Sequence, residues 1–151
     1  MSIRLPESVK TFFLQKSWEP SSFQKQAWSA YLKGDSGLIH APTGTGTTLA
    51  ARVGPYLDTL TDFSKVTRGL RVIWITPMRA LASDTEKSLR EISEGIGLSW
   101  EIKRRTGDTT STERVKIRKD PPQLLITTPE SFSLMLSYED FEKRLKITQC
   151  V

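Results

Sequence analysis

The fold is decided by one stretch of this sequence, which reads His-Ala-Pro-Thr-Gly-Thr-Gly-Thr-Thr at positions 40–48. Leu38, Ile39 and Ala41 are typical of the end of a buried strand, and Thr47 begins a run that favours a helix. A strand, a glycine turn and a helix N-terminus place several backbone N–H groups around one point, where the helix dipole favours an anion. The stretch therefore predicts a phosphate-binding loop between a strand and a helix.

The lysine of that loop is missing. The usual pattern is Gly, four residues, Gly, Lys and then Ser or Thr. Here Ala41 stands in place of the first glycine, Thr47 stands in place of the lysine, and Thr48 keeps the hydroxyl that would hold Mg²⁺. Taken alone, the stretch fits an ordinary glycine turn equally well, so the remaining sequence has to decide.

Composition limits the class of protein. The 151 residues suit one domain or part of one, and 37% hydrophobic with 26% charged residues is typical of a soluble globular protein. The net charge of +5 permits a polyanionic partner. Because Cys150 is the single cysteine, an internal disulfide is excluded, which fits a reducing cytoplasm. The lone His40 cannot form a metal-binding cluster with other histidines or cysteines. No apolar run is long enough to span a membrane.

Two helices are expected before the loop. Val9, Phe12 and Phe13 share one face of the first helix, and the second begins at Ser21 and stops at Gly34. The second helix has one apolar side formed by Phe23, Ala27, Ala30 and Tyr31. The helix after the loop is expected to be short or kinked, because Gly-Pro at 54–55 interrupts it.

Strands and helices alternate in the second half. Apolar strands are predicted at 70–76, 98–102 and 124–126, with helices over 81–92, from a capping box at 110–113, and from 128–130. This alternation predicts a parallel sheet with helices on both faces.

Three strand ends share one design: Ala-Pro-Thr-Gly at 41–44, Thr-Pro-Met-Arg at 76–79 and Thr-Thr-Pro-Glu at 127–130. Each alone fits a plain helix cap followed by proline. Together at the carboxyl edge of a parallel sheet, where ligands bind, they predict a site for phosphate groups.

These blocks resemble the first RecA-like domain of superfamily 2 DExH-box helicases, closest to the long-helicase-related and ligase-associated group. The resemblance runs from Trp18 to the C-terminus. Five stretches match that group's blocks in order: a Q motif at 20–24, motif I at 41–48, motif Ia at 76–82, and further blocks at 105–109 and 127–131.

The resemblance implies a three-layer P-loop NTPase (RecA-like) α/β fold with a mainly parallel sheet. Residues 1–34 would be a helical Q-motif region and 35–151 the P-loop sheet, ending before the motif II strand. It implies an ATP- and Mg²⁺-dependent helicase, cytoplasmic and not membrane-bound, that acts on single-stranded nucleic acid, expected to be DNA. Implied partners are a second RecA-like domain and DNA ligase or nuclease repair proteins.

The resemblance also assigns residues. Gln24 would read the adenine edge, although it also fits the capping-box partner of Ser21, and Thr48 would ligate Mg²⁺. Asp108 is expected to cap a turn, because a carboxylate would repel phosphate. The remaining nucleotide-binding residues would be Thr43, Gly44, Thr45, Gly46 and Thr47. The residues that contact the nucleic-acid backbone, called the track, would be Arg79, Thr106, Gly107 and Thr128. Nearby basic side chains would add electrostatic attraction: Lys103, Arg104, Arg105, Arg114, Lys116, Arg118 and Lys119.

Two departures limit what the resemblance implies. Thr47 is neutral and too short to reach the β- and γ-phosphates, a loss of roughly 1.5–3 kcal/mol for one charge-assisted contact. No Asp-Glu-x-His sequence occurs in the 151 residues, so no residue is predicted to be catalytic. The leading hypothesis is an inactive part of a helicase. The alternative is a degenerate, non-hydrolysing nucleic-acid-binding paralogue; a small P-loop kinase is disfavoured by the blocks at 76–79 and 127–130.

Overall fold

The computed structural model describes residues 3–42, 44–62, 69–77, 79–145 and 148. The chain divides into two compact units, unit 1 with Met1–Val66 and Ile92–Leu98, and unit 2 with Thr67–Glu91 and Ser99–Val151. Helix α4 (Arg79–Gly95) contributes to both.

Unit 1 is helical. Its first helix, α1 (Glu7–Gln15), buries Val9, Phe12 and Phe13, which confirms the predicted face. Aromatic edges meet there: the ring centroids of Phe12 and Phe13 lie 5.7 Å apart, and those of Phe13 and Trp28 lie 5.9 Å apart. This aromatic cluster belongs to the buried core.

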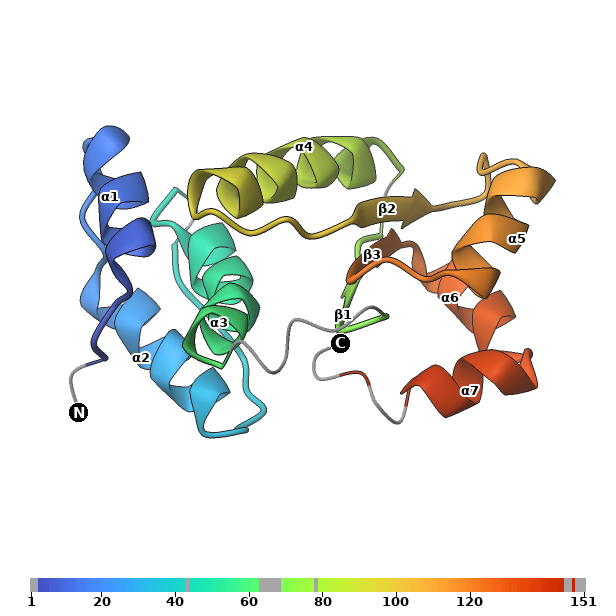
Figure 1. Ribbon diagram of the computed structural model, residues 1–151, viewed down its shortest axis with the longest axis horizontal. Helices are drawn as coiled ribbons and strands as arrows, with labels where there is room; N and C mark the ends of the chain where they lie inside the picture. Colours follow the sequence, from blue (N-terminus) through green and yellow to red (C-terminus); the bar gives the residue numbers. More distant parts are fainter. Residues whose placement is uncertain (1–2, 43, 63–68, 78, 146–147, 149–151) are drawn as a thin grey trace. The chain divides into compact units, whose positions relative to one another are not determined.

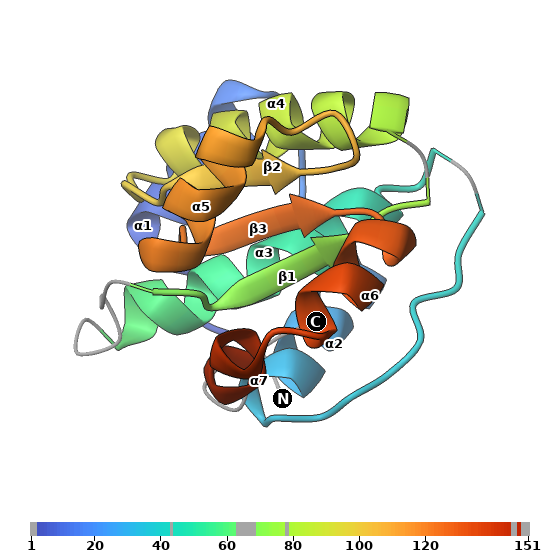
Figure 2. The same cartoon turned by 90° about the vertical axis from the view of Figure 1, so that its right-hand side faces the viewer.

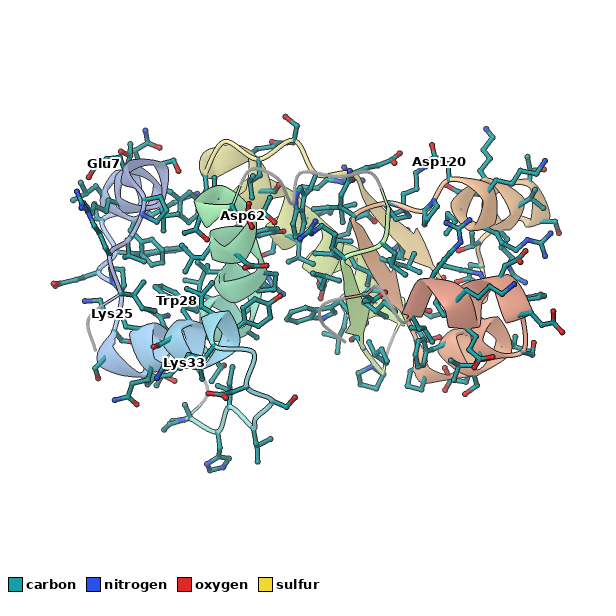
Figure 3. The ribbon with its side chains drawn as sticks, turned by 60° about the horizontal axis from the view of Figure 1, so that its bottom comes forward. Glu7, Lys25, Trp28, Lys33, Asp62 and Asp120 are labelled. Carbon is teal, nitrogen blue, oxygen red and sulfur yellow. The ribbon has the colours of Figure 1, made fainter. Side chains whose placement is uncertain are left out.

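Helix α2 (Ser22–Leu32) begins after Ser21, as predicted, but its most buried side chains are Gln24 and Trp28. The predicted face, with Phe23 and Ala27, is only half-buried. The Trp28 indole donates a hydrogen bond of 3.2 Å to the Leu49 carbonyl of α3 (Thr47–Thr61), beside which α2 lies (Figures 1 and 3). A buried polar contact to the next helix therefore sets the inward side of α2.

Helix α3 is one helix of 15 residues with Pro55 inside it, so the expectation of a short helix is wrong, while a kink at Gly54-Pro55 stays a prediction. Pro55 removes one intrahelical hydrogen bond. Burial of Val53, Tyr56 and Leu57 on either side offsets that loss. Gly54 has a packing role instead, since a Cβ there would lie 3.0 Å from the Tyr31 ring.

The strand expected before the loop is also absent, because the described residues 35–42 form no regular structure. The Leu38 side chain is 91% exposed and Ile39 is 38% exposed. A parallel strand is stable only when hydrogen-bonded to a neighbour, and the sheet of the described residues pairs three other segments. An apolar sequence without a pairing partner therefore stays an extended loop.

Unit 2 is built on a three-stranded parallel sheet in the order β1-β3-β2, whose arrows all point the same way in Figure 2. The strands are β1 (Val72–Ile75), β2 (Ile102–Arg105) and β3 (Leu124–Thr127). β1 lies within a predicted strand, and β3 contains one and extends it by Thr127. β2 shares only Ile102 with the strand predicted at 98–102, so Leu98 and Trp100 do not belong to it. All four β3 residues are buried, as expected for a central strand covered on both faces.

Three helices of unit 2 pack beside the sheet (Figure 2): α5 (Ser111–Lys119), α6 (Pro129–Leu136) and α7 (Glu139–Leu145). Thr110 and Thr128 cap α5 and α6, close to where the sequence predicted their starts. The core between these helices and the sheet contains Leu70, Ile73, Ile117, Leu125, Met135 and Phe141. Among the described residues, no helix has both the length and the apolar character needed to cross a lipid bilayer.

Candidate nucleotide and nucleic-acid sites

The glycine loop of unit 1 turns where the sequence predicts it. Gly44 and Gly46 have φ of 85° and 89°, the left-handed region that favours glycine. The Thr45 hydroxyl donates to the Pro42 carbonyl at 2.6 Å, and the Thr45 N–H donates to the same oxygen at 3.3 Å. These two bonds close the turn. Thr43, also predicted to bind nucleotide, lies outside the described residues.

Helix α3 starts directly after this turn. Gly46 is its N-cap and provides no side-chain hydrogen bond, and Thr47 and Thr48 are the first two helical residues. The first N–H groups of an α-helix have no intrahelical acceptor, so the N-terminus of α3 is suited to binding an anion. Thr48 is exposed, and its contact with Mg²⁺ stays a prediction. The positive charge that a lysine would add at Thr47 is missing.

Gln24 joins α2 to this loop. Its Oε1 accepts from the Ser21 N–H at 2.9 Å and the Ser21 hydroxyl accepts from the Gln24 N–H at 3.4 Å, so the capping box is present. Its Nε2 donates to the Gly46 carbonyl at 3.1 Å, and the side chain is 4% exposed. The capping-box alternative is confirmed, while the adenine contact stays a prediction.

Three of the four predicted track residues, Arg79, Gly107 and Thr128, line one cleft of about 410 Å³ in unit 2. They come from the start of α4, the turn after β2 and the N-cap of α6, which lie far apart in the sequence. The fourth, Thr106, is buried beside the cleft. The other lining residues are Pro77, Arg105, Arg114, Glu130, Ser131 and Leu134.

The turn after β2 is closed by Thr109, and the expectation that Asp108 caps it is wrong. The Thr109 hydroxyl accepts from the Thr106 N–H at 2.9 Å, and the Thr109 N–H donates to the Thr106 carbonyl at 3.2 Å. Asp108 instead points at Arg79, whose Nη1 lies 2.7 Å from its Oδ1. A hydroxyl reaches the neighbouring backbone as well as a carboxylate does, which leaves Asp108 for the guanidinium.

Sequence reasoning missed the structural roles of Arg105 and Arg114. Arg105 is only 7% exposed, and its Nη1 donates to the Ser131 carbonyl at 3.1 Å. Burial lowers the pKa of its guanidinium, and the charge of Arg114 lowers it further. Arg114 donates to the Gly107 carbonyl at 2.8 Å. The two arginines therefore hold the backbone around the cleft. The only sequence signals were the place of Arg105 in the block at 105–109 and the basic character of the helix that contains Arg114.

The other basic residues of β2 are already paired. The Lys103 ammonium lies 2.8 Å from the Glu101 carboxylate, and the Arg104 Nε lies 3.7 Å from Glu86. These ion pairs reduce the attraction that the cluster 103–105 was expected to offer. Thr128 has a structural contact as well, because its hydroxyl accepts from the Ser131 N–H at 3.5 Å.

Comparison with known proteins places the chain among helicases. A family model described as DEAD/DEAH box helicase matches residues 21–151. An Lhr helicase of Mycolicibacterium smegmatis is 40% identical over 145 residues, which cover 89% of this chain and 10% of that protein. An ATP-dependent helicase Lhr-Core of Sulfolobus acidocaldarius is 40% identical over 154 residues, which cover 96% of this chain and 17% of that protein.

A solved structure of Mycobacterium smegmatis helicase Lhr bound to ssDNA and AMP-PNP has a TM-score of 0.79 at 34% identity, covering 96% of this chain and 19% of that one. This likeness confirms the predicted α/β fold of the RecA-like type. The chain spans between a tenth and a fifth of the length of these relatives.

Proposed function

This chain belongs to the DEAD/DEAH box helicase family, close to Lhr-type helicases, and we propose that it forms part of the ATP-binding RecA-like domain of a DNA helicase. The observation that carries this proposal is the meeting of Arg79, Gly107 and Thr128 in one cleft. Three blocks separated in sequence bring a guanidinium, a glycine backbone and a helix N-cap together, as a phosphate-binding track requires.

ATP is the proposed ligand of the loop in unit 1. Gln24 and residues 43–48 would hold it, with the uncapped N-terminus of α3 facing the phosphates and Thr48 facing Mg²⁺. The left-handed Gly44 and Gly46 leave the loop free of side chains where phosphate would approach. When bound, Mg²⁺ would neutralise charge on the β- and γ-phosphates. The backbone of the loop is suited to the phosphates of a nucleotide, but the loop lacks the positive charge that a lysine would provide at position 47.

Single-stranded DNA is the proposed ligand of the cleft. The lining includes guanidinium, hydroxyl and backbone groups, which contact phosphate and sugar and carry no sequence information, together with one carboxylate, that of Glu130. The Lhr structure bound to ssDNA supports DNA over RNA. In a whole helicase of this type, a second RecA-like domain would complete the motor, and DNA repair partners such as a ligase or nuclease are proposed from the family alone.

The 151-residue chain is expected to hydrolyse no ATP above background, because it has neither the motif I lysine nor an Asp-Glu pair. The alternative is a paralogue that binds nucleic acid without turnover, for which Thr47 is the specific evidence. Phosphate release with and without single-stranded DNA tests the expectation, and DNA-stimulated turnover by this chain would contradict it.

Binding of a fluorescent oligodeoxythymidine, followed by anisotropy at low and moderate salt, tests the proposed track. Arg79→Ala should weaken binding about two- to fivefold, the range for one exposed ion pair. Lys87→Ala is the matched control, since it removes one exposed positive charge from α4 that does not line the cleft. Equal losses in the two variants, or binding insensitive to salt, would show that the cleft is not the track.

A further inference from the structure

The cations of the cleft are not equally available. Arg105 is buried and donates to the Ser131 carbonyl, and Arg114 donates to the Gly107 carbonyl. Arg79 is the exposed guanidinium among the cleft's described lining residues, with 62% of its side chain exposed. A phosphate entering the cleft therefore meets Arg79 as its most accessible cationic partner.

Arg79 is already engaged. Its Nη1 lies 2.7 Å from Asp108 Oδ1, and the Asp108 side chain is 70% exposed. The guanidinium lies across Gly107 so closely that a Cβ at Gly107 would come within 2.5 Å of Arg79 Nη2. The missing side chain of Gly107 and the charge of Asp108 together hold the guanidinium at the cleft wall.

A carboxylate and a phosphate offer a guanidinium the same pattern of acceptor oxygens. We propose that the Asp108 carboxylate occupies, in the protein without nucleic acid, the position on Arg79 that a backbone phosphate of a single strand takes on binding. This inference rests on the proposed function, because it assigns a role within the same DNA track. Asp108 then lowers the affinity of the track, since each phosphate that reaches Arg79 must displace it.

Asp108→Asn tests this exchange. With fluorescent oligodeoxythymidine as the probe, the variant should bind about two- to fivefold more tightly at low salt, the value of one exposed ion pair. The slope of log affinity against log salt should steepen by about 0.7, because one more uncompensated cation meets the single strand. Asp120 is the C-cap of α5 (Figure 3) and does not line the cleft. Asp120→Asn makes the same change in net charge and should have less than half the effect.

A double-variant cycle gives the decisive comparison. In the Arg79→Ala background, Asp108→Asn should lose its advantage and behave like Asp120→Asn. Equal tightening by Asp108→Asn with and without Arg79, or weaker binding by Asp108→Asn alone, would overturn the exchange. Absence of DNA binding by every variant at low salt would instead overturn the proposed function, and melting temperatures close to that of the parent chain verify that each variant is folded.

Discussion

At the scale of single residues, Thr47 separates the geometry of the phosphate loop from its charge. The turn at Gly44–Gly46 and the uncapped start of α3 are in place around it, and Thr47 itself is the first helical residue. Backbone N–H groups and the helix dipole bind anions without a lysine, although more weakly. Nucleotide binding by this loop can therefore be tested independently of nucleotide hydrolysis.

Thr47→Lys should strengthen nucleotide binding about tenfold or more, because one charge-assisted hydrogen bond contributes roughly 1.5–3 kcal/mol. Titration with a fluorescent ATP analogue measures the gain. Thr47→Met adds similar length without charge and should give little improvement. ATP turnover should stay at background in both variants, since the chain contains no Asp-Glu pair. If methionine increased the affinity for the ATP analogue as much as lysine does, packing and not charge would limit nucleotide binding by the loop.

At the scale of elements, Gln24 connects the first turn of α2 to the loop before α3. The Gly46 carbonyl accepts from both Gln24 Nε2 and the Ala50 N–H, at 3.1 Å each. A side chain at Gly46 would come within 2.5 Å of that Nε2, whereas one at Gly44 meets nothing within 4 Å. The two glycines share a left-handed backbone and differ in what surrounds them.

Gly44→Ala and Gly46→Ala should therefore destabilise the protein to different degrees. Both introduce a left-handed non-glycine residue, which costs roughly 1–2 kcal/mol. Gly46→Ala should cost more, because it also displaces the Gln24 amide. Urea unfolding measures the difference, and in a Gln24→Ala background the extra cost of Gly46→Ala should disappear. Equal stability of the two alanine variants in the parent chain would mean that the Gln24 amide does not pack closely against Gly46.

Elements with a strong local pattern were predictable. The face of α1 follows from the spacing of its apolar residues, and β1 and β3 follow from continuous apolar runs, which are typical of strands covered on both faces. The predictions of a strand ending at Ala41 and of a short helix at Gly54-Pro55 were wrong, because strand pairing and side-chain packing decide these two elements. No described strand pairs with Leu38, and buried neighbours carry α3 through Pro55.

The candidate sites show the same division. Arg79, Gly107 and Thr128 were identified from blocks of sequence, and the structure places them in one cleft. The ion pair of Arg79 with Asp108 and the buried hydrogen bond of Arg105 join residues 29 and 26 positions apart. Such long-range contacts have no local signature, so the sequence could suggest which residues matter without showing what each one contacts.

At the scale of the whole molecule, stability comes from the cores of the two units, and none of the residues 35–42 of unit 1 is buried. Leu38 and Ile73 are both large apolar residues from predicted strands, yet Leu38 is 91% exposed and Ile73 is 1% exposed. Ile73 belongs to the core beneath α5, α6 and α7, where its removal would leave a cavity. Leu38 is not buried in this way, so its side chain contributes little to folding and is accessible to other molecules.

Ile73→Ala should cost about 2–5 kcal/mol, the range for truncating a buried isoleucine. Leu38→Ser should change the free energy of unfolding by less than about 0.5 kcal/mol, as expected for an exposed site. Because 1 kcal/mol shifts the melting temperature of a chain of this size by about 2–4 °C, thermal melts distinguish the two. Light scattering at rising protein concentration should show less self-association for Leu38→Ser than for the parent chain. A loss of stability on Leu38→Ser comparable to that of Ile73→Ala would mean that the segment is packed in solution as the buried strand that its sequence predicts.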